Sequence, residues 1–153
     1  MRRLAGILSA LIASAVTTLL LRASLQMVLI ERESQTMVAS VPTWITQLVL
    51  PLSFAIIAVW LVWRADTRWP GRAIAATGIA IGAWIGQYPQ FFEAKPAWPA
   101  MVVVLIGTVL GGPIFATLGG VALFLFMSNG VPIAAMPVET YRLAVSPTLA
   151  AVP

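Results

Sequence analysis

The sequence predicts an all-α integral membrane protein with about four to five transmembrane helices and a C-terminal helix at the membrane surface. The nine Lys and Arg and five Asp and Glu residues are gathered in short bands, so that residues 4–21, 34–63, 73–92 and 96–138 are uncharged. Hydrophobic residues make up 60% of the 153-residue chain, and the mean hydropathy is +0.96. A bilayer core about 30 Å thick requires about 20 helical residues, so each uncharged stretch is a candidate span.

The first predicted helix covers residues 4–30, with Arg22 close to its outer end. Two sets of small residues recur along it at intervals of four: Ser9, Ala13 and Thr17, and Ala10, Ser14 and Thr18. Such a face allows neighbouring helices to approach closely. The start of the chain also resembles a secretory signal with a cleavage site at residues 13–15, but the apolar run continues through that site, which favours a span. We expect Arg22 to reach the interface or a lipid phosphate rather than to take part in transport.

The second predicted helix covers residues 42–63 and follows a polar link over residues 31–40. Pro42 lies in its first turn, where a missing N–H costs least, whereas Pro51 lies inside it and should bend it. Tryptophans typical of a membrane interface lie at its two ends: Trp44, Trp60 and Trp63.

The third predicted helix covers residues 73–92 and carries Gly78, Gly82 and Gly86 at strict four-residue spacing. This doubled small-xxx-small motif leaves three patches without side chains on one face and predicts close contact with another helix. Aromatic residues follow as an interfacial belt: Tyr88, Phe91, Phe92 and Trp98.

The 43-residue uncharged stretch is too long for one crossing. Gly111, Gly112 and Pro113 predict a break, because two flexible residues and one without an N–H interrupt the helical hydrogen bonds. We expect helices over residues 99–110 and 113–127, either as one kinked helix or as two shorter packed pieces. The break is either architectural or lines a substrate or ion path, as interrupted helices do in transporters.

An amphipathic stretch over residues 138–145 predicts the interfacial helix, with Glu139 and Arg142 on one face. The connection over residues 64–72 holds three Arg against one Asp, which predicts a cytoplasmic loop. The basic N-terminus then lies on the same side, so we expect a multi-pass protein with a cytoplasmic N-terminus.

Composition also restricts the chemistry. The chain has no Cys and no His, which excludes disulfides, thiol chemistry and imidazole catalysis. The five acidic residues lie at or outside the span ends, so no acid and base pair can be assigned. The basic residues lie at span ends rather than in one patch, which indicates topology rather than nucleic-acid binding. We therefore expect no enzymatic activity, no cofactor and no metal site in these residues.

Residues 112–122 and 138–153 resemble the start of the large permease subunit of TRAP transporters, the tripartite ATP-independent periplasmic class. In that family a G-x-P in an apolar helix, here Gly111 and Pro113, is followed after a connecting helix by L-x-A-[IV]-P, here residues 149–153. Residues 41–54 are similar to the last helix of the small subunit, although Ser53 stands where that pattern usually has glycine.

The resemblance implies a fused permease: residues 1–65 as the end of the small part, 66–97 as a linking span, and 98–153 as the truncated start of the large part. Such a transporter in the bacterial inner membrane would import an organic acid, typically a carboxylate, with a sodium gradient and a periplasmic solute-binding protein. This chain would form scaffold, with the remaining permease segments and the lipid bilayer as its partners and with the substrate and sodium sites elsewhere. The alternative is a small membrane interaction or assembly protein that binds partner helices through the Gly78, Gly82 and Gly86 face without transporting solute.

Overall fold

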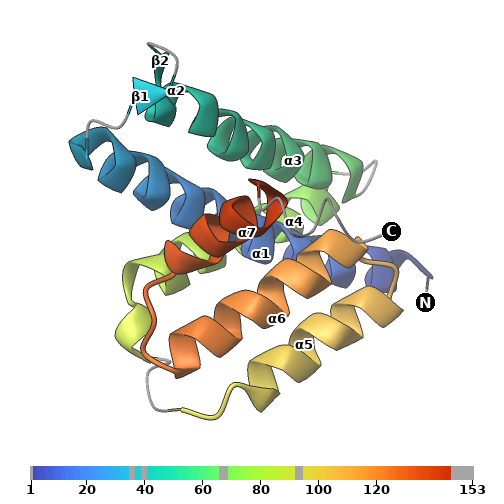
Figure 1. The fold of residues 1–153 in the computed structure, drawn as a ribbon. Helices are drawn as coiled ribbons and strands as arrows, with labels where there is room; N and C mark the ends of the chain where they lie inside the picture. The colour runs from blue at the N-terminus through green and yellow to red at the C-terminus, as the bar shows by residue number, and fades with distance from the viewer. Residues whose placement is uncertain (1, 35–36, 39–40, 66–68, 92–94, 146–153) are drawn as a thin grey trace, which may run out of the picture.

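A computed structural model describes residues 2–34, 37–38, 41–65, 69–91 and 95–145 (Figure 1). The predicted all-helical class is confirmed over these residues, with one small antiparallel sheet as an addition. In chain order the elements are α1 (Arg2–Ser34), β1 (Met37–Val38), β2 (Val41–Pro42), α2 (Thr43–Gln47), α3 (Val49–Ala65), α4 (Trp69–Gln87), the 3-10 helix η1 (Pro89–Phe91), α5 (Trp98–Val109), α6 (Ile114–Ser128) and α7 (Ala135–Val145). In the sheet, Met37 pairs with Pro42 and Val38 with Val41.

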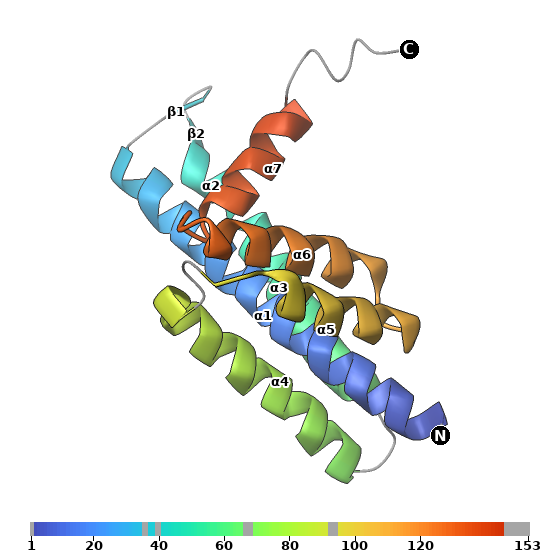
Figure 2. The ribbon, with the colours of Figure 1, turned by 90° about the horizontal axis from the view of Figure 1, so that it is seen from below.

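The helix α1 lies at the centre of the bundle. The helices α3, α4, α5, α6 and α7 all pack against it. Figure 2 shows α4 on one side of α1 and the pair α5 and α6 on the other. One helix therefore contacts elements from each of the three regions into which the sequence analysis divides the chain.

The helix α1 is longer than predicted. It continues through Glu31 and Glu33 to Ser34, so the expected polar link over residues 31–40 is wrong in its first four residues. Glu and Arg are good helix formers, and charge by itself does not end a helix. The 33 residues give a length of about 50 Å, well beyond the thickness of a bilayer core.

The second predicted helix is interrupted next to its proline. The helix α2 ends at Gln47, α3 begins at Val49, and Leu48 forms a turn between them. Pro51 has no N–H to bond the carbonyl of Gln47, four residues earlier, and its ring crowds that carbonyl. The interruption therefore lies one turn before the proline that causes it.

The helix α4 begins and ends earlier than predicted. It includes Trp69 and Arg72, which the sequence analysis assigns to a loop, because Pro70 is tolerated in a first turn whose N–H groups have no helical partner. It ends at Gln87 instead of residue 92, since Pro89 disfavours helical geometry at Tyr88. The chain continues as η1, and Phe92 lies outside the described residues.

The helices α5 and α6 form a hairpin, the second of the two arrangements expected for the broken stretch. They pack side by side, joined by a turn over residues 110–113 (Figures 1 and 2). Their 12 and 15 residues correspond to about 18 and 22 Å. The helix α7 begins three residues before the predicted interfacial segment and packs on α1 and α6.

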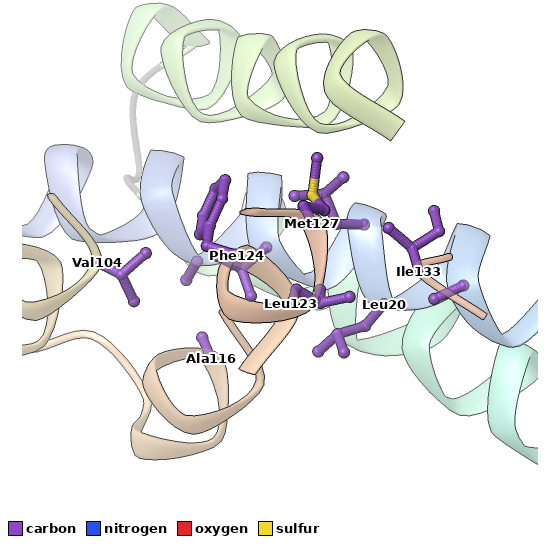
Figure 3. Close-up of a cluster of buried hydrophobic side chains, with 11 residues drawn as sticks. Leu20, Val104, Ala116, Leu123, Phe124, Met127 and Ile133 are labelled. Carbon is purple, nitrogen blue, oxygen red and sulfur yellow. The ribbon is translucent and has the colours of Figure 1, made fainter. Parts of the chain in front are cut away.

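The core lies where the hairpin meets α1. Leu123 and Met127 of α6 are almost fully buried, and with Phe124 they lie close to Leu20 of α1 (Figure 3). Leu19 and Ala23 of α1 belong to the same buried cluster. Val104 of α5 and Ile133, before α7, extend this apolar cluster at its two ends.

Large apolar side chains also cover the outside of the bundle. On α3, Ile56 is 68% exposed and Val59 is 62% exposed, and Val109 of α5 is 88% exposed. Within the described residues, two segments are long and apolar enough to cross a bilayer: Ala5–Glu33, with a mean hydropathy of 1.8, and Thr43–Ala65, with 2.2. The helices α5 and α6 are apolar but shorter.

Candidate functional site: the packing faces of α1

The three glycines of α4 lie against successive turns of α1. Gly78 faces the carbonyl oxygen of Leu11, and Gly82 faces that of Ala15, so a Cβ at either glycine would overlap an oxygen atom. Gly86 faces the side chain of Arg22, where a Cβ would lie 2.9 Å from Cδ. Successive glycines meet successive turns of α1, so the two helices run in the same direction with their backbones in direct contact.

A hydrogen bond joins the same two helices at Ser14. Its hydroxyl lies 2.9 Å from the carbonyl oxygen of Ala75 on α4 and 2.9 Å from that of Leu11 on α1, so one proton is shared between two acceptors. Ser14 and Ala75 are both completely buried. The four-residue recurrence of small residues marks Ser14 in the sequence, but its partner on α4 is visible only in the structure.

Arg22 lies against α4. Its Nη1 donates a hydrogen bond of 2.9 Å to the carbonyl oxygen of Ala83. The sequence does not predict this bond, which forms because the open face at Gly86 lets the side chain cross to α4. A guanidinium near the C-terminal end of a helix is also favoured by the helix dipole.

The other buried hydroxyls of α1 are bonded within their own helix. Thr17 Oγ1 donates to the carbonyl oxygen of Ala13, and Thr18 Oγ1 donates to that of Ser14, each at 2.7 Å. Ser9 Oγ donates to Gly6 at 3.0 Å. These bonds satisfy the buried hydroxyl groups, so the small side chains that carry them can pack closely against neighbouring helices.

The turn between α5 and α6 depends on Gly111. Its φ of +101° lies in a region that side-chain-bearing residues rarely adopt. The N–H groups of Gly111 and Gly112 donate to the carbonyl oxygens of Thr108 and Gly107, each at 2.9 Å, which closes the end of α5. A hydrogen bond between the hydroxyls of Thr108 and Thr117 then ties the two helices together just above the turn.

Three further glycines, absent from the predicted packing motif, fit the hairpin onto α1. A Cβ at Gly107 would lie 3.0 Å from Ile12, one at Gly119 would lie 2.9 Å from Leu20, and one at Gly120 would lie 3.0 Å from Val16. The sequence carries a signal for part of this contact, since Gly120 continues a four-residue recurrence of small residues with Gly112 and Ala116, but Gly107 and Gly119 lie outside that series.

The aromatic residues after α4 form a cluster. The ring centroids of Trp84, Tyr88 and Phe91 lie 5.8 to 6.1 Å apart, with Trp84 and Phe91 stacked. Tyr88 and Phe91 are half exposed, as is Trp98 at the start of α5. They gather at one end of α4, and Trp60, Trp63 and Trp69 gather near its other end.

The acidic residues that the structure describes, Glu31, Glu33 and Glu139, do not assemble into a site. No three His, Cys, Asp or Glu residues come together among the described residues. Glu139 pairs with Arg142 on α7, with 3.4 Å between Oε1 and Nη1, and both side chains are exposed. Asp66, Glu93 and the segment 149–153 used in the family resemblance lie outside the described residues.

Comparison of the chain with family models, with curated proteins and with solved structures gives no match.

Proposed function

We propose that this chain is a membrane-embedded scaffold of a TRAP-type transporter, which imports an organic acid with a sodium gradient and a periplasmic solute-binding protein. The observation that carries the proposal is the packing of α1, which is held by glycine contacts on two sides. The glycines of α4 touch its backbone, and Gly107, Gly119 and Gly120 of the hairpin fit around its side chains. Helices in such close contact cannot slide past one another without steric overlap. This packing therefore suits the rigid part of a transporter in which another part moves.

The bilayer placement is supported by the apolar surface and by the direction of the helices. The helices α1 and α4 run in parallel, and α3, which lies between them in the sequence, runs in the opposite direction, so three crossings alternate in direction. Arg64 at the end of α3 and Arg72 in the first turn of α4 then lie at the same end as the start of α1, which agrees with a cytoplasmic start in the bacterial inner membrane. The hairpin enters from the opposite end and returns to it.

The family assignment is supported by residue patterns, and above all by the G-x-P at Gly111 and Pro113. This pattern lies at the turn of the hairpin, where the chain changes from α5 to α6. In the proposed transporter the remaining permease segments hold substrate and sodium, and the described part of this chain supplies a frame whose interior hydroxyls are already bonded.

The alternative, a membrane assembly protein that transports nothing, is favoured by one surface. Exposed side chains on α3 recur at spacings of three and four residues, as they do on a helix that packs on a partner: Val49, Leu52, Ile56, Val59 and Trp63. A transporter scaffold has the same need for partner helices, so this surface fits both functions.

Reconstitution separates the two functions. The chain is co-expressed with the remaining permease segments, purified, placed in proteoliposomes and supplied with the solute-binding protein, and uptake of a labelled carboxylate is measured with and without a sodium gradient. Uptake that requires sodium and the binding protein supports the transporter. A stable complex that shows no uptake for any organic acid tested overturns it and leaves the assembly protein.

A matched pair of variants tests the scaffold role. We expect Gly82→Ala to lower uptake together with the yield of complex, because the new methyl group overlaps the backbone of α1. Gly6→Ala adds the same group where nothing lies within 4 Å and should leave the yield of complex unchanged.

A further inference from the structure

A cavity of about 450 Å³ lies at the end of the bundle where α1 begins. Its walls come from the first turns of α1, the last turns of α3, and the turn between α5 and α6. Figure 1 shows these three segments together at one end of the molecule. Gly6 and Gly111, which carry no side chain, lie in two of these walls, so the space stays open.

The cavity has one charged wall. Among the described residues that line it, Arg64 is the single ionisable side chain. Its guanidinium carbon lies 5.0 Å from the centroid of the Trp60 ring, within the range of a cation–π contact. This contact holds the positive charge at the mouth of the cavity without neutralising it, so the guanidinium can still donate hydrogen bonds to an anion.

The other walls are mostly apolar. Leu61, Ala10 and Pro113 present carbon atoms, and Ser9 uses its hydroxyl proton within α1. A small hydrophilic anion would leave these walls uncovered. A ligand that matches the whole cavity carries a negative group next to an apolar chain.

We propose that this cavity binds an anionic phospholipid, with its phosphate at Arg64 and the first part of an acyl chain against Leu61 and Pro113. The proposal rests on the bilayer placement given above. In that placement the cavity opens at the cytoplasmic face, where anionic lipids and basic residues attract one another and where Trp is enriched. The lipid would fill the space between the hairpin turn and the ends of α1 and α3 and join the three segments.

Binding is measured on the purified full chain in a neutral detergent. Phosphatidylglycerol, phosphatidylcholine or inorganic phosphate is titrated, and the midpoint of thermal unfolding and the lipid retained in native mass spectrometry are recorded. We expect phosphatidylglycerol to raise the midpoint and to be retained, and the other two to have little effect. Equal effects of the two lipids, or an equal effect of phosphate alone, would overturn the proposal.

Variants locate the site. Arg64→Gln should weaken the apparent affinity for phosphatidylglycerol about tenfold, which corresponds to the loss of about 1.4 kcal/mol. Arg142→Gln removes an exposed arginine of α7 and should change nothing. Trp60→Leu should also weaken binding, whereas Trp63→Leu, on the same helix but outside the cavity, should not. An equal loss in both members of either pair would contradict the assignment.

Two further measurements distinguish a lost lipid contact from a misfolded variant and test the bilayer placement. Arg64→Lys retains the charge and should bind better than Arg64→Gln, which distinguishes a lost contact from a misfolded variant. Flotation with vesicles tests the bilayer placement itself, and a chain that stays in the aqueous fraction would overturn both proposals. A chain that prefers phosphatidylglycerol in a complex without uptake would overturn the transporter but leave the lipid site standing.

Discussion

Nη1 of Arg22 donates a hydrogen bond of 2.9 Å to the backbone carbonyl oxygen of Ala83 and so joins α1 to the end of α4. The contact requires Gly86, because a side chain there would lie in the path of the arginine stem. One charged residue thus contributes to the packing between α1 and α4, beside the glycine contacts of the same two helices.

Replacement of Arg22 by methionine keeps an unbranched apolar stem and removes the donor. We expect Arg22→Met to lower the free energy of unfolding by about 1.5 kcal/mol, since hydrogen bonds to charged groups contribute about 1.5–3 kcal/mol and this one is only partly buried. Denaturant titration in detergent micelles measures the change. The control is Arg142→Met, where an exposed ion pair is lost and a change below about 0.5 kcal/mol is expected. Equal effects would mean that the bond to Ala83 contributes nothing.

The glycine face of α4 predicts a sharp dependence on position. Gly82→Ala should destabilise the bundle by about 2–3 kcal/mol, because its Cβ meets the carbonyl oxygen of Ala15 and the backbones must separate. Gly6→Ala, in the first part of α1, meets no atom and should be neutral or slightly stabilising, since alanine favours the helix. The same micelle titration compares them, and a neutral Gly82→Ala would exclude the close contact.

The sequence predicts which helix faces make close contacts but not which helices those faces meet. The spacing of Gly78, Gly82 and Gly86 predicts a contact face, yet nothing local says that the face meets Leu11, Ala15 and Arg22, because that choice depends on how the whole chain folds back. Charge alone likewise marks Arg22 as a residue for the interface, and its bond to Ala83 depends on the gap left by Gly86.

The side-by-side arrangement of α5 and α6 also could not be predicted from the local sequence. Gly111 and Pro113 predict a break whether the two halves remain roughly collinear or fold together. The hairpin is favoured by contacts distant in sequence, such as Gly120 against Val16 and Gly119 against Leu20. The interruption at Leu48 lies one turn before Pro51, since a proline removes the bond to the carbonyl four residues before it.

The turn itself gives a prediction about backbone conformation. Gly111→Ala should cost about 1–2 kcal/mol, although no atom lies within 4 Å of the added Cβ, because alanine is strained at a φ of +101°. Gly111→Asn should cost less, since asparagine tolerates positive φ better. Thermal unfolding in one detergent ranks the three proteins. If the alanine variant is as stable as the asparagine variant, conformational strain at this residue is not what selects glycine.

At Gln47 we expect a substitution to raise the stability of the protein, in contrast to the substitutions above. It is 4% exposed, and its Oε1 has no hydrogen-bond partner among the described residues. An unpaired buried amide oxygen is costly, so Gln47→Met should raise the free energy of unfolding by up to about 1 kcal/mol. Gln87→Met, at the exposed end of α4, serves as the control and should change it by less than about 0.5 kcal/mol. A clear loss of stability in Gln47→Met would mean that this oxygen is bonded to something in the native protein.

The folded-back arrangement of α5 and α6 can be tested by topology, because the chain contains no cysteine of its own. In the proposed bilayer placement, Trp98→Cys before the hairpin and Asn129→Cys after it lie on one side of the membrane, and Ala65→Cys at the end of α3 lies on the other. A membrane-impermeant maleimide added to intact cells should therefore label residues 98 and 129 and spare residue 65, and all three should react after the membrane is permeabilised. A single kinked helix would instead place residue 129 on the side of residue 65. Labelling of residue 98 without residue 129 would thus exclude the hairpin in the membrane, and labelling of residue 65 alone would reverse the orientation while leaving the hairpin intact.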